Sequence, residues 1–172
     1  MTVMVFSRLM EKGSFEYPFH YNFTYVHFLP GGYLNSKTVR TSYLGNSKFT
    51  FLDEDQLTKW IKKLYLDVNE PVKPTKILDI GTGTGGSAFV LATLFPDAQV
   101  MGIDLAPGYI RFCRQEMETR NFTNLQFYQA DGEDMTAFVD DNSIDFINFA
   151  YVLHEMPKVL FKPTQLARND RL

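Results

Sequence analysis

The chain has 172 residues, 45% of them hydrophobic, which is enough for one domain with a sizeable core. Its net charge of −3 and the lack of any Lys/Arg run argue against a nucleic-acid partner, which usually requires a basic face. No apolar stretch reaches membrane-spanning length, and the single cysteine, Cys113, excludes an internal disulfide and favours a reducing, cytoplasmic location.

The first fifty residues are predicted to form an N-terminal extension, residues 1–50. Aromatic side chains are concentrated in residues 17–28, and Pro30-Gly31-Gly32 marks a turn. Two interpretations stay open: a cap whose aromatics line a substrate pocket, or a segment whose aromatics only pack on the core. His20 and His27 have no third ligand at a suitable spacing, so no metal site is expected.

A helix is predicted from Asp53 to Asp67, because Asp53 and Gln56 have the spacing of a capping box. Its apolar residues recur at helical spacing and should pack on the sheet that follows. This stripe consists of Leu57, Trp60, Ile61, Leu64 and Tyr65.

The stretch that organises the chain is Lys76-Ile-Leu-Asp-Ile-Gly-Thr-Gly-Thr-Gly-Gly-Ser87. It predicts a buried strand over residues 77–80, a glycine turn, and a helix over residues 87–95. Such a unit presents backbone N–H groups and a helix N-terminus to a nucleotide-like ligand.

The glycine spacing fits two cofactors. Gly81-x-Gly83-x-x-Gly86 matches the dinucleotide fingerprint, which leaves a nicotinamide-dependent oxidoreductase as one alternative. However, Asp79 lies two residues before Gly81, and a carboxylate inside a strand is costly to bury. Asp79 would repel a pyrophosphate but would favour the α-amino group of S-adenosylmethionine (SAM). SAM is therefore the preferred ligand.

The remaining elements alternate between strands and helices. This order predicts a parallel sheet with right-handed crossovers and a ligand over the carboxyl ends of its strands. The expected elements are a strand at 99–105, a helix at 107–120, a strand at 125–129, a short helix at 133–139 and a strand at 144–151.

Four motifs in this order resemble the class I SAM-dependent methyltransferases, in particular those that act on small molecules. They are the glycine-rich stretch, Val100–Leu105, Gln129–Glu133 and Ser143–Pro157. The resemblance covers a core at residues 51–157 and implies an α/β, Rossmann-like parallel sheet of order 3-2-1-4 with flanking helices. It also implies SAM as cofactor and methyl transfer to a small-molecule acceptor.

The resemblance assigns the methionine end of SAM to the first motif. Gly81, Thr82 and Gly83 would let the backbone approach the methionine portion. Asp79 would steady its ammonium group, directly or through water. Ala150, at the end of the fourth strand, would border the transferable methyl group.

The resemblance assigns the adenosine end to the next two motifs. Asp104 would accept both ribose hydroxyls, although it could instead cap the following helix. Leu105 would lie against the adenine, and Asp131 with the Gly132 N–H would read its edge, unless this pair only forms a surface turn. His154 is a candidate general base, or else a helix cap.

After residue 157 the sequence departs from the family pattern. Residues 158–163 look like the segment that usually precedes strand five, yet they follow Met156-Pro157 directly. We therefore expect residues 158–172 to be a truncated tail, with the family's later strands missing. The fourth strand would then be an exposed edge capable of self-association. A non-catalytic SAM-binding fragment or pseudoenzyme is accordingly the alternative function.

Overall fold

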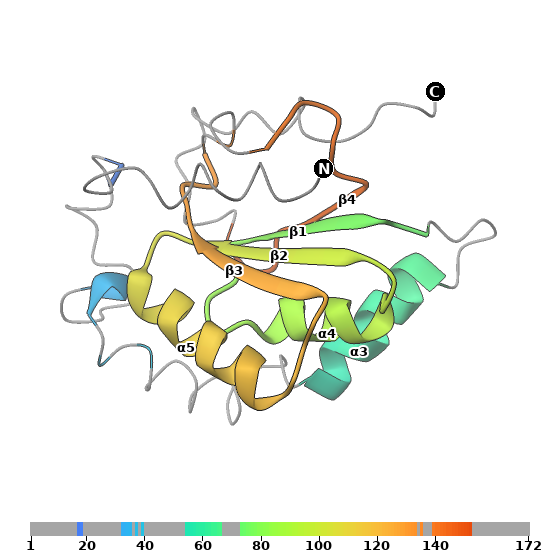
Figure 1. Ribbon diagram of the computed structural model, residues 1–172, viewed down its shortest axis with the longest axis horizontal. Helices are drawn as coiled ribbons and strands as arrows, with labels where there is room; N and C mark the ends of the chain where they lie inside the picture. Colours follow the sequence, from blue (N-terminus) through green and yellow to red (C-terminus); the bar gives the residue numbers. More distant parts are fainter. Residues whose placement is uncertain are drawn as a thin grey trace.

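The computed structural model describes residues 17–18, 32–35, 37, 39, 54–66, 73–133, 135 and 139–152. In these ranges four parallel strands form one sheet in the spatial order β3-β2-β1-β4, which confirms the predicted Rossmann-like topology (Figure 1). The strands are β1 (Lys76–Ile80), β2 (Gln99–Asp104), β3 (Leu125–Gln129) and β4 (Phe146–Asn148). The helical elements are the 3-10 turn η3 (Gly32–Leu34), α3 (Glu54–Ile61), the π-helical η4 (Lys62–Leu66), α4 (Gly86–Leu94) and α5 (Pro107–Thr119).

β1 lies in the middle of the sheet and sets the register on both sides. Ile80 pairs with Ile103 of β2, and Asp79 pairs with Asn148 of β4. Asp104 in turn pairs with Gln129 at the end of β3. Because all four strands run in one direction, their carboxyl ends lie on the same side of the molecule, at the left of Figure 1.

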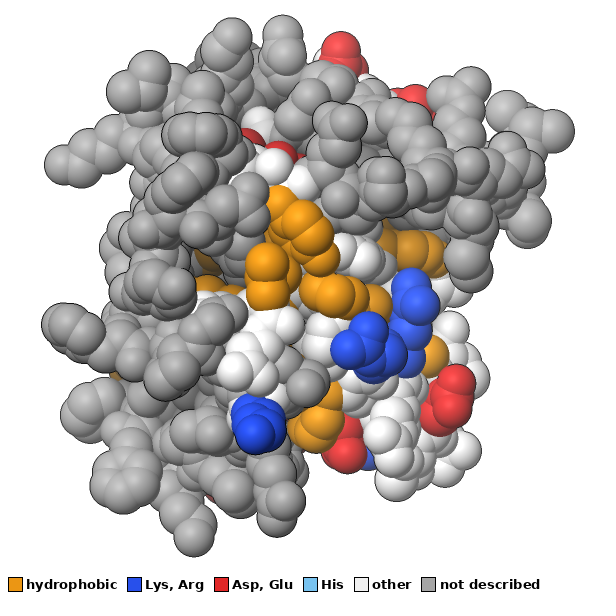
Figure 2. All heavy atoms as spheres, turned by 90° about the vertical axis from the view of Figure 1, so that its left-hand side faces the viewer, with side chains coloured by type: hydrophobic (Ala, Val, Ile, Leu, Met, Phe, Trp, Pro, Cys, Tyr) orange, Lys and Arg blue, Asp and Glu red, His pale blue; other side chains and the backbone are white. Residues whose placement is uncertain are grey.

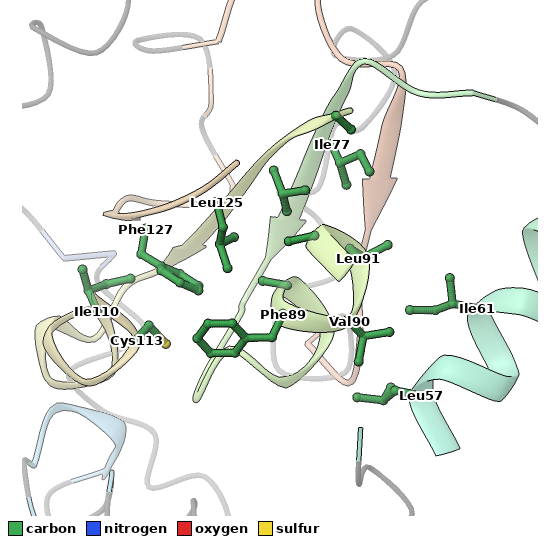
Figure 3. Packing of buried hydrophobic residues seen from close by; sticks show 14 residues of the cluster. Leu57, Ile61, Ile77, Phe89, Val90, Leu91, Ile110, Cys113, Leu125 and Phe127 are labelled. Carbon is green, nitrogen blue, oxygen red and sulfur yellow. The ribbon is translucent and has the colours of Figure 1, made fainter. Parts of the chain in front are cut away.

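The larger part of the core fills the space between one sheet face and helices α4 and α5. Six of the nine residues of α4 are buried, as expected for a helix that is apolar on all sides. The Phe89 ring lies 5.5 Å from the Phe127 ring of β3, close to Cys113 of α5 (Figure 3). A second cluster on the other face contains Leu78, Ile80, Ile103, Ala130, Met135, Val139 and Ile144.

Helix α3 packs differently from the prediction. Leu57 and Ile61 are buried, but Trp60 is 43% exposed and Leu64 is 64% exposed. The reason is that α3 packs mainly beside α4 and not on the sheet itself (Figure 3). One helix against another buries only a narrow stripe, so Trp60 of α3 and Leu64 of η4, both in the predicted apolar face, stay in contact with solvent.

The fourth strand is shorter in the structure than predicted. β4 covers only Phe146–Asn148 of the predicted strand 144–151, and the chain beyond it turns, with a φ of +59° at Tyr151. Of the helix predicted at 133–139, only residues 133, 135 and 139 lie in the described part of the chain, where the Val139 N–H donates to the Met135 carbonyl at 3.0 Å.

Candidate functional site

The glycine turn between β1 and α4 is tied to the end of β2. The Thr82 N–H donates to the Ile103 carbonyl at 2.9 Å, and the Gly83 N–H donates to Asp104 Oδ2 at 2.9 Å. The Gly85 N–H donates to the Thr82 carbonyl at 2.8 Å. These three N–H groups are therefore used inside the protein, and the expectation that the turn presents them bare to a ligand is wrong.

What the turn offers to a ligand is space. Gly83 has a φ of +54°, and among the described residues no heavy atom lies within 4 Å of a Cβ built on it. Gly81 is different, because a Cβ there would lie 2.4 Å from Cγ2 of Val152. Gly83 thus marks the open side of the turn, whereas Gly81 is required by the protein's own packing.

Asp79 lies beneath this turn and joins three parts of the chain. Its side chain is fully buried. Its carboxylate accepts hydrogen bonds from Thr82 Oγ1 at 2.6 Å, from Ser87 Oγ at 2.8 Å and from Asn148 Nδ2 at 2.5 Å. The glycine turn, the first turn of α4 and β4 therefore meet at one carboxylate.

Burial raises the pKa of Asp79 above its ordinary value, and the hydrogen bonds from Thr82, Asn148 and Ser87 lower it in part. A carboxylate held in this way favours a nearby positive charge, because such a charge would offset the cost of its desolvation.

Asp104 stands at the carboxyl end of β2 and is half-buried. Besides the bond from Gly83, its Oδ1 accepts the N–H of Ala106 at 2.9 Å, immediately before α5 begins at Pro107. This bond forms a turn that leads into α5, and it is not the helix cap that was the alternative for Asp104, because Ala106 is the N-cap residue and α5 has no side-chain cap. A carboxylate offers about four acceptor positions, so these two bonds and ligand binding are compatible.

The third loop of the site follows β3. Asp131 and Gly132 are half-buried, and Asp131 Oδ1 accepts the N–H of Glu133 at 2.8 Å, which makes a local turn. The Ala130 N–H donates to the Asp104 carbonyl at 3.1 Å. This bond brings the β3 loop beside Leu105, the residue expected to lie against the adenine.

The segment after β4 closes the other end of the site. Ala150 is half-buried, Tyr151 is 58% exposed, and Val152 lies against Gly81. The structure therefore brings the end of the fourth strand beside the glycine turn. His154 lies outside the described residues.

Sequence reasoning missed two partners of Asp79 and one support of the turn. The sequence pattern predicts Ser87 only as the start of a helix and Asn148 only as part of a strand. Asn148 could have been found from the register, because it is the residue of β4 level with Asp79. Cys113 donates its thiol hydrogen to the Gly83 carbonyl, with Sγ 3.2 Å from the oxygen. No local pattern signals this contact, which spans 30 residues.

The site contains acidic and small residues and a patch of apolar surface. Seen from the side where the strands end, hydrophobic side chains gather in the middle of the described surface (Figure 2). Within the described ranges, no three His, Cys, Asp or Glu residues are placed to hold a metal ion. None of the helices in those ranges has both the length and the apolar character needed to cross a bilayer.

These features fit the cofactor that the sequence predicted. The open side of Gly83 can admit a chain without a side-chain clash, and Asp104 lies next to it with a carboxylate for hydroxyl groups. Asp79 supplies negative charge below the turn, where a cationic group would be favoured.

A family model described as "Methyltransferase domain" matches residues 71–163, more than half of the chain. A fatty-acid O-methyltransferase from Mycolicibacterium smegmatis is 30% identical over 118 residues, which are 67% of this chain and 41% of that protein. A malonyl-[acyl-carrier protein] O-methyltransferase from Paenibacillus is 34% identical over 89 residues, which are 51% of this chain and 32% of that protein. The chain thus spans less than half the length of these curated relatives.

Solved structures share the fold. The crystal structure of a SAM-dependent methyltransferase from Aquifex aeolicus superimposes with a TM-score of 0.57 and 18% identity. The superposition covers 78% of this chain and 68% of that one. At this identity the likeness bears on the architecture alone.

Proposed function

Because the chain belongs to the class I SAM-dependent methyltransferase family, we propose that the carboxyl edge of its sheet binds SAM and that the protein transfers the methyl group to a small-molecule acceptor. The observation that carries this proposal is the bond from the Gly83 N–H to Asp104, which sets an open glycine beside a carboxylate. The family match overturns the alternative of a nicotinamide-dependent oxidoreductase, which was supported only by the glycine spacing.

In the proposed complex the methionine portion lies along Gly81, Thr82 and Gly83, on the open side of the turn. Asp79 is fully buried, so it acts on the ammonium group through its charge and by holding Thr82 in place. Ala150 borders the methyl group.

The adenosine portion lies over the ends of β2 and β3. Asp104 accepts the ribose hydroxyls while it holds Gly83 and Ala106. Leu105 contacts the adenine. Asp131 and the Gly132 N–H form hydrogen bonds with the exocyclic amine and a ring nitrogen of the adenine.

When SAM is bound, its sulfonium supplies an activated methyl group. The chain's own contribution is to align the acceptor and to exclude water. For an acceptor that must lose a proton, we propose His154 as the base; an amine acceptor would not require one.

The proposed acceptor is a small molecule and not a nucleic acid. The net charge of −3 disfavours polyanions. One relative named above is an O-methyltransferase of fatty acids and the other of malonyl-[acyl-carrier protein], a protein conjugate, so carboxylic acids, as in the first relative, are the first small-molecule acceptor class to test. The proposal retains the division into an N-terminal extension or cap at 1–50, a core at 51–157 and a tail at 158–172, and the cytoplasmic location.

Two further possibilities belong to the proposal. The chain could bind SAM without catalysis, which is the alternative function. It could also self-associate through β4, which pairs only with β1 among the described strands. Sedimentation velocity over a range of concentrations tests the second point, since a constant monomer would contradict it.

The decisive experiment is calorimetric titration of the chain with S-adenosylhomocysteine. We expect binding by the natural sequence and a loss of about 10- to 100-fold in Asp104→Ala, because a hydrogen bond to a charged group contributes about 1.5–3 kcal/mol. Asp104→Asn, which keeps one acceptor oxygen, should lose less. Asp97→Ala is the matched control, because Asp97 is exposed at the opposite end of β2.

Absence of binding in a chain shown to be folded would contradict the proposal for this molecule. If binding is found, incubation with radiolabelled SAM and a panel of carboxylic acids separates a catalyst from a non-catalytic binder, because only a catalyst transfers label to an acceptor.

A further inference from the structure

The N-terminal extension reaches the adenosine side of the site through Tyr17. Gln129 Nε2 donates to Tyr17 Oη at 3.1 Å and to the Leu105 carbonyl at 3.1 Å. Gln129 is the last residue of β3 and pairs in register with Asp104. One side-chain amide therefore joins Tyr17 to the loop that follows β2.

A second contact holds the same extension beside this loop. Val39 is buried with Ala106 and Tyr109, and the Tyr33 ring lies 6.2 Å from the Tyr109 ring. In Figure 1 the η3 turn that contains Tyr33 lies next to the start of α5, on the side where the strands end. Gln129 thus links Leu105 to Tyr17, and Ala106 is buried together with Val39 of the extension.

We infer that Tyr17 is part of the cofactor site and that its ring forms a wall of the adenosine pocket. The inference rests on the proposed function. Asp104, Leu105 and Asp131, which we assign to adenosine, lie on the same two strand ends that Gln129 joins to Tyr17. Tyr17 is half-buried and carries a flat aromatic face, and adenine is a flat aromatic ring. In this arrangement Gln129 is a positioning residue, because it acts through Tyr17 and Leu105.

The test compares two ligands that share adenosine but differ at the other end. S-adenosylhomocysteine has the amino-acid portion, and 5′-methylthioadenosine lacks it. We expect Tyr17→Ala to weaken both ligands by the same factor, about tenfold, because an aromatic wall against a base contributes about this much. Tyr17→Phe should retain most of the affinity, since it keeps the ring.

Three controls make the outcome specific. Trp60→Ala removes a large aromatic side chain from α3 and should leave both affinities unchanged. Gln129→Ala should weaken binding by a smaller factor than Tyr17→Ala, because it only frees the ring. Urea unfolding without ligand checks that each variant is folded.

The possible outcomes separate the inference from the proposal beneath it. Equal binding by Tyr17→Ala and the natural sequence would overturn the inference alone. So would a loss confined to S-adenosylhomocysteine, because the effect would then lie at the amino-acid end. If the natural sequence binds neither ligand, the proposed function and this inference both fall.

Discussion

Gly81 and Val152 approach each other so closely that a Cβ on the glycine would lie 2.4 Å from Cγ2 of the valine. The two residues are joined by packing across the β1 turn and the segment after β4. This contact holds the end of the fourth strand over the glycine turn. It also gives Gly81 a packing requirement that Gly83, on the open side of the turn, does not have.

Gly81→Ala should destabilise the protein by about 3 kcal/mol, because the new side chain adds a left-handed backbone cost at φ +69° to an overlap with Val152. Urea unfolding followed by circular dichroism measures this change. A loss below about 1 kcal/mol would show that the segment after β4 moves aside freely.

Gly83→Ala is the matched counterpart, since its φ of +54° carries the same backbone cost without an overlap among the described residues. We expect a loss of only about 1–2 kcal/mol in the free energy of unfolding. The affinity for S-adenosylhomocysteine should nevertheless fall by at least about tenfold, because the new Cβ would enter the space proposed for the ligand. Unchanged affinity in a folded variant would place the ligand elsewhere.

Asp79 should make stability depend on pH. Its pKa is raised in the folded protein above the ordinary value of 3.8, so the folded state holds this proton more tightly than the unfolded state. The contribution of Asp79 to stability is therefore fully present below about pH 4 and is lost as pH rises through the folded pKa.

The measurement compares the natural sequence with Asp79→Asn by urea unfolding between pH 4 and pH 8. The free energy of unfolding of the natural sequence, relative to the variant, should decrease as pH rises. A difference that stays constant or increases would mean that the hydrogen bonds from Thr82, Ser87 and Asn148 outweigh the cost of burial.

Cys113 should be almost unreactive in the folded chain. Its side chain is fully buried, and burial together with the negative charges of Asp104, Asp79 and Glu116 raises its pKa. Because the thiolate is the reactive form, labelling with a disulfide reagent at pH 8 should be at least about 100-fold slower in buffer than in urea. Equal labelling rates in buffer and in urea would contradict the buried hydrogen bond to Gly83. The Cys113→Ser variant, which has no cysteine, gives the background signal.

Much of the site was predictable, because its strands, turn and helices are specified by residues that lie close together in the sequence. The strand, glycine turn and helix between Lys76 and Leu94 follow from apolar runs and glycine spacing, and so does the alternation that leads to Gln129. Such patterns depend on residues a few positions apart, and their periodicity can be read directly. The stripe on α3 was only half correct, because periodicity identifies an apolar face but not the width of the surface that covers it.

The sequence by itself determined the parallel βαβ order, the glycine turn and the acidic residues at the ends of the first three strands. The tertiary structure alone decided what these residues contact. It formed the hydrogen bonds from Asn148 to Asp79, from Cys113 to the Gly83 carbonyl, and from Gln129 to Tyr17, which lies 112 residues away in the sequence. The physical reason is that secondary structure follows from local backbone preferences and the spacing of apolar side chains. Side-chain contacts between distant residues depend on strand register and packing, which exist only once the chain has folded.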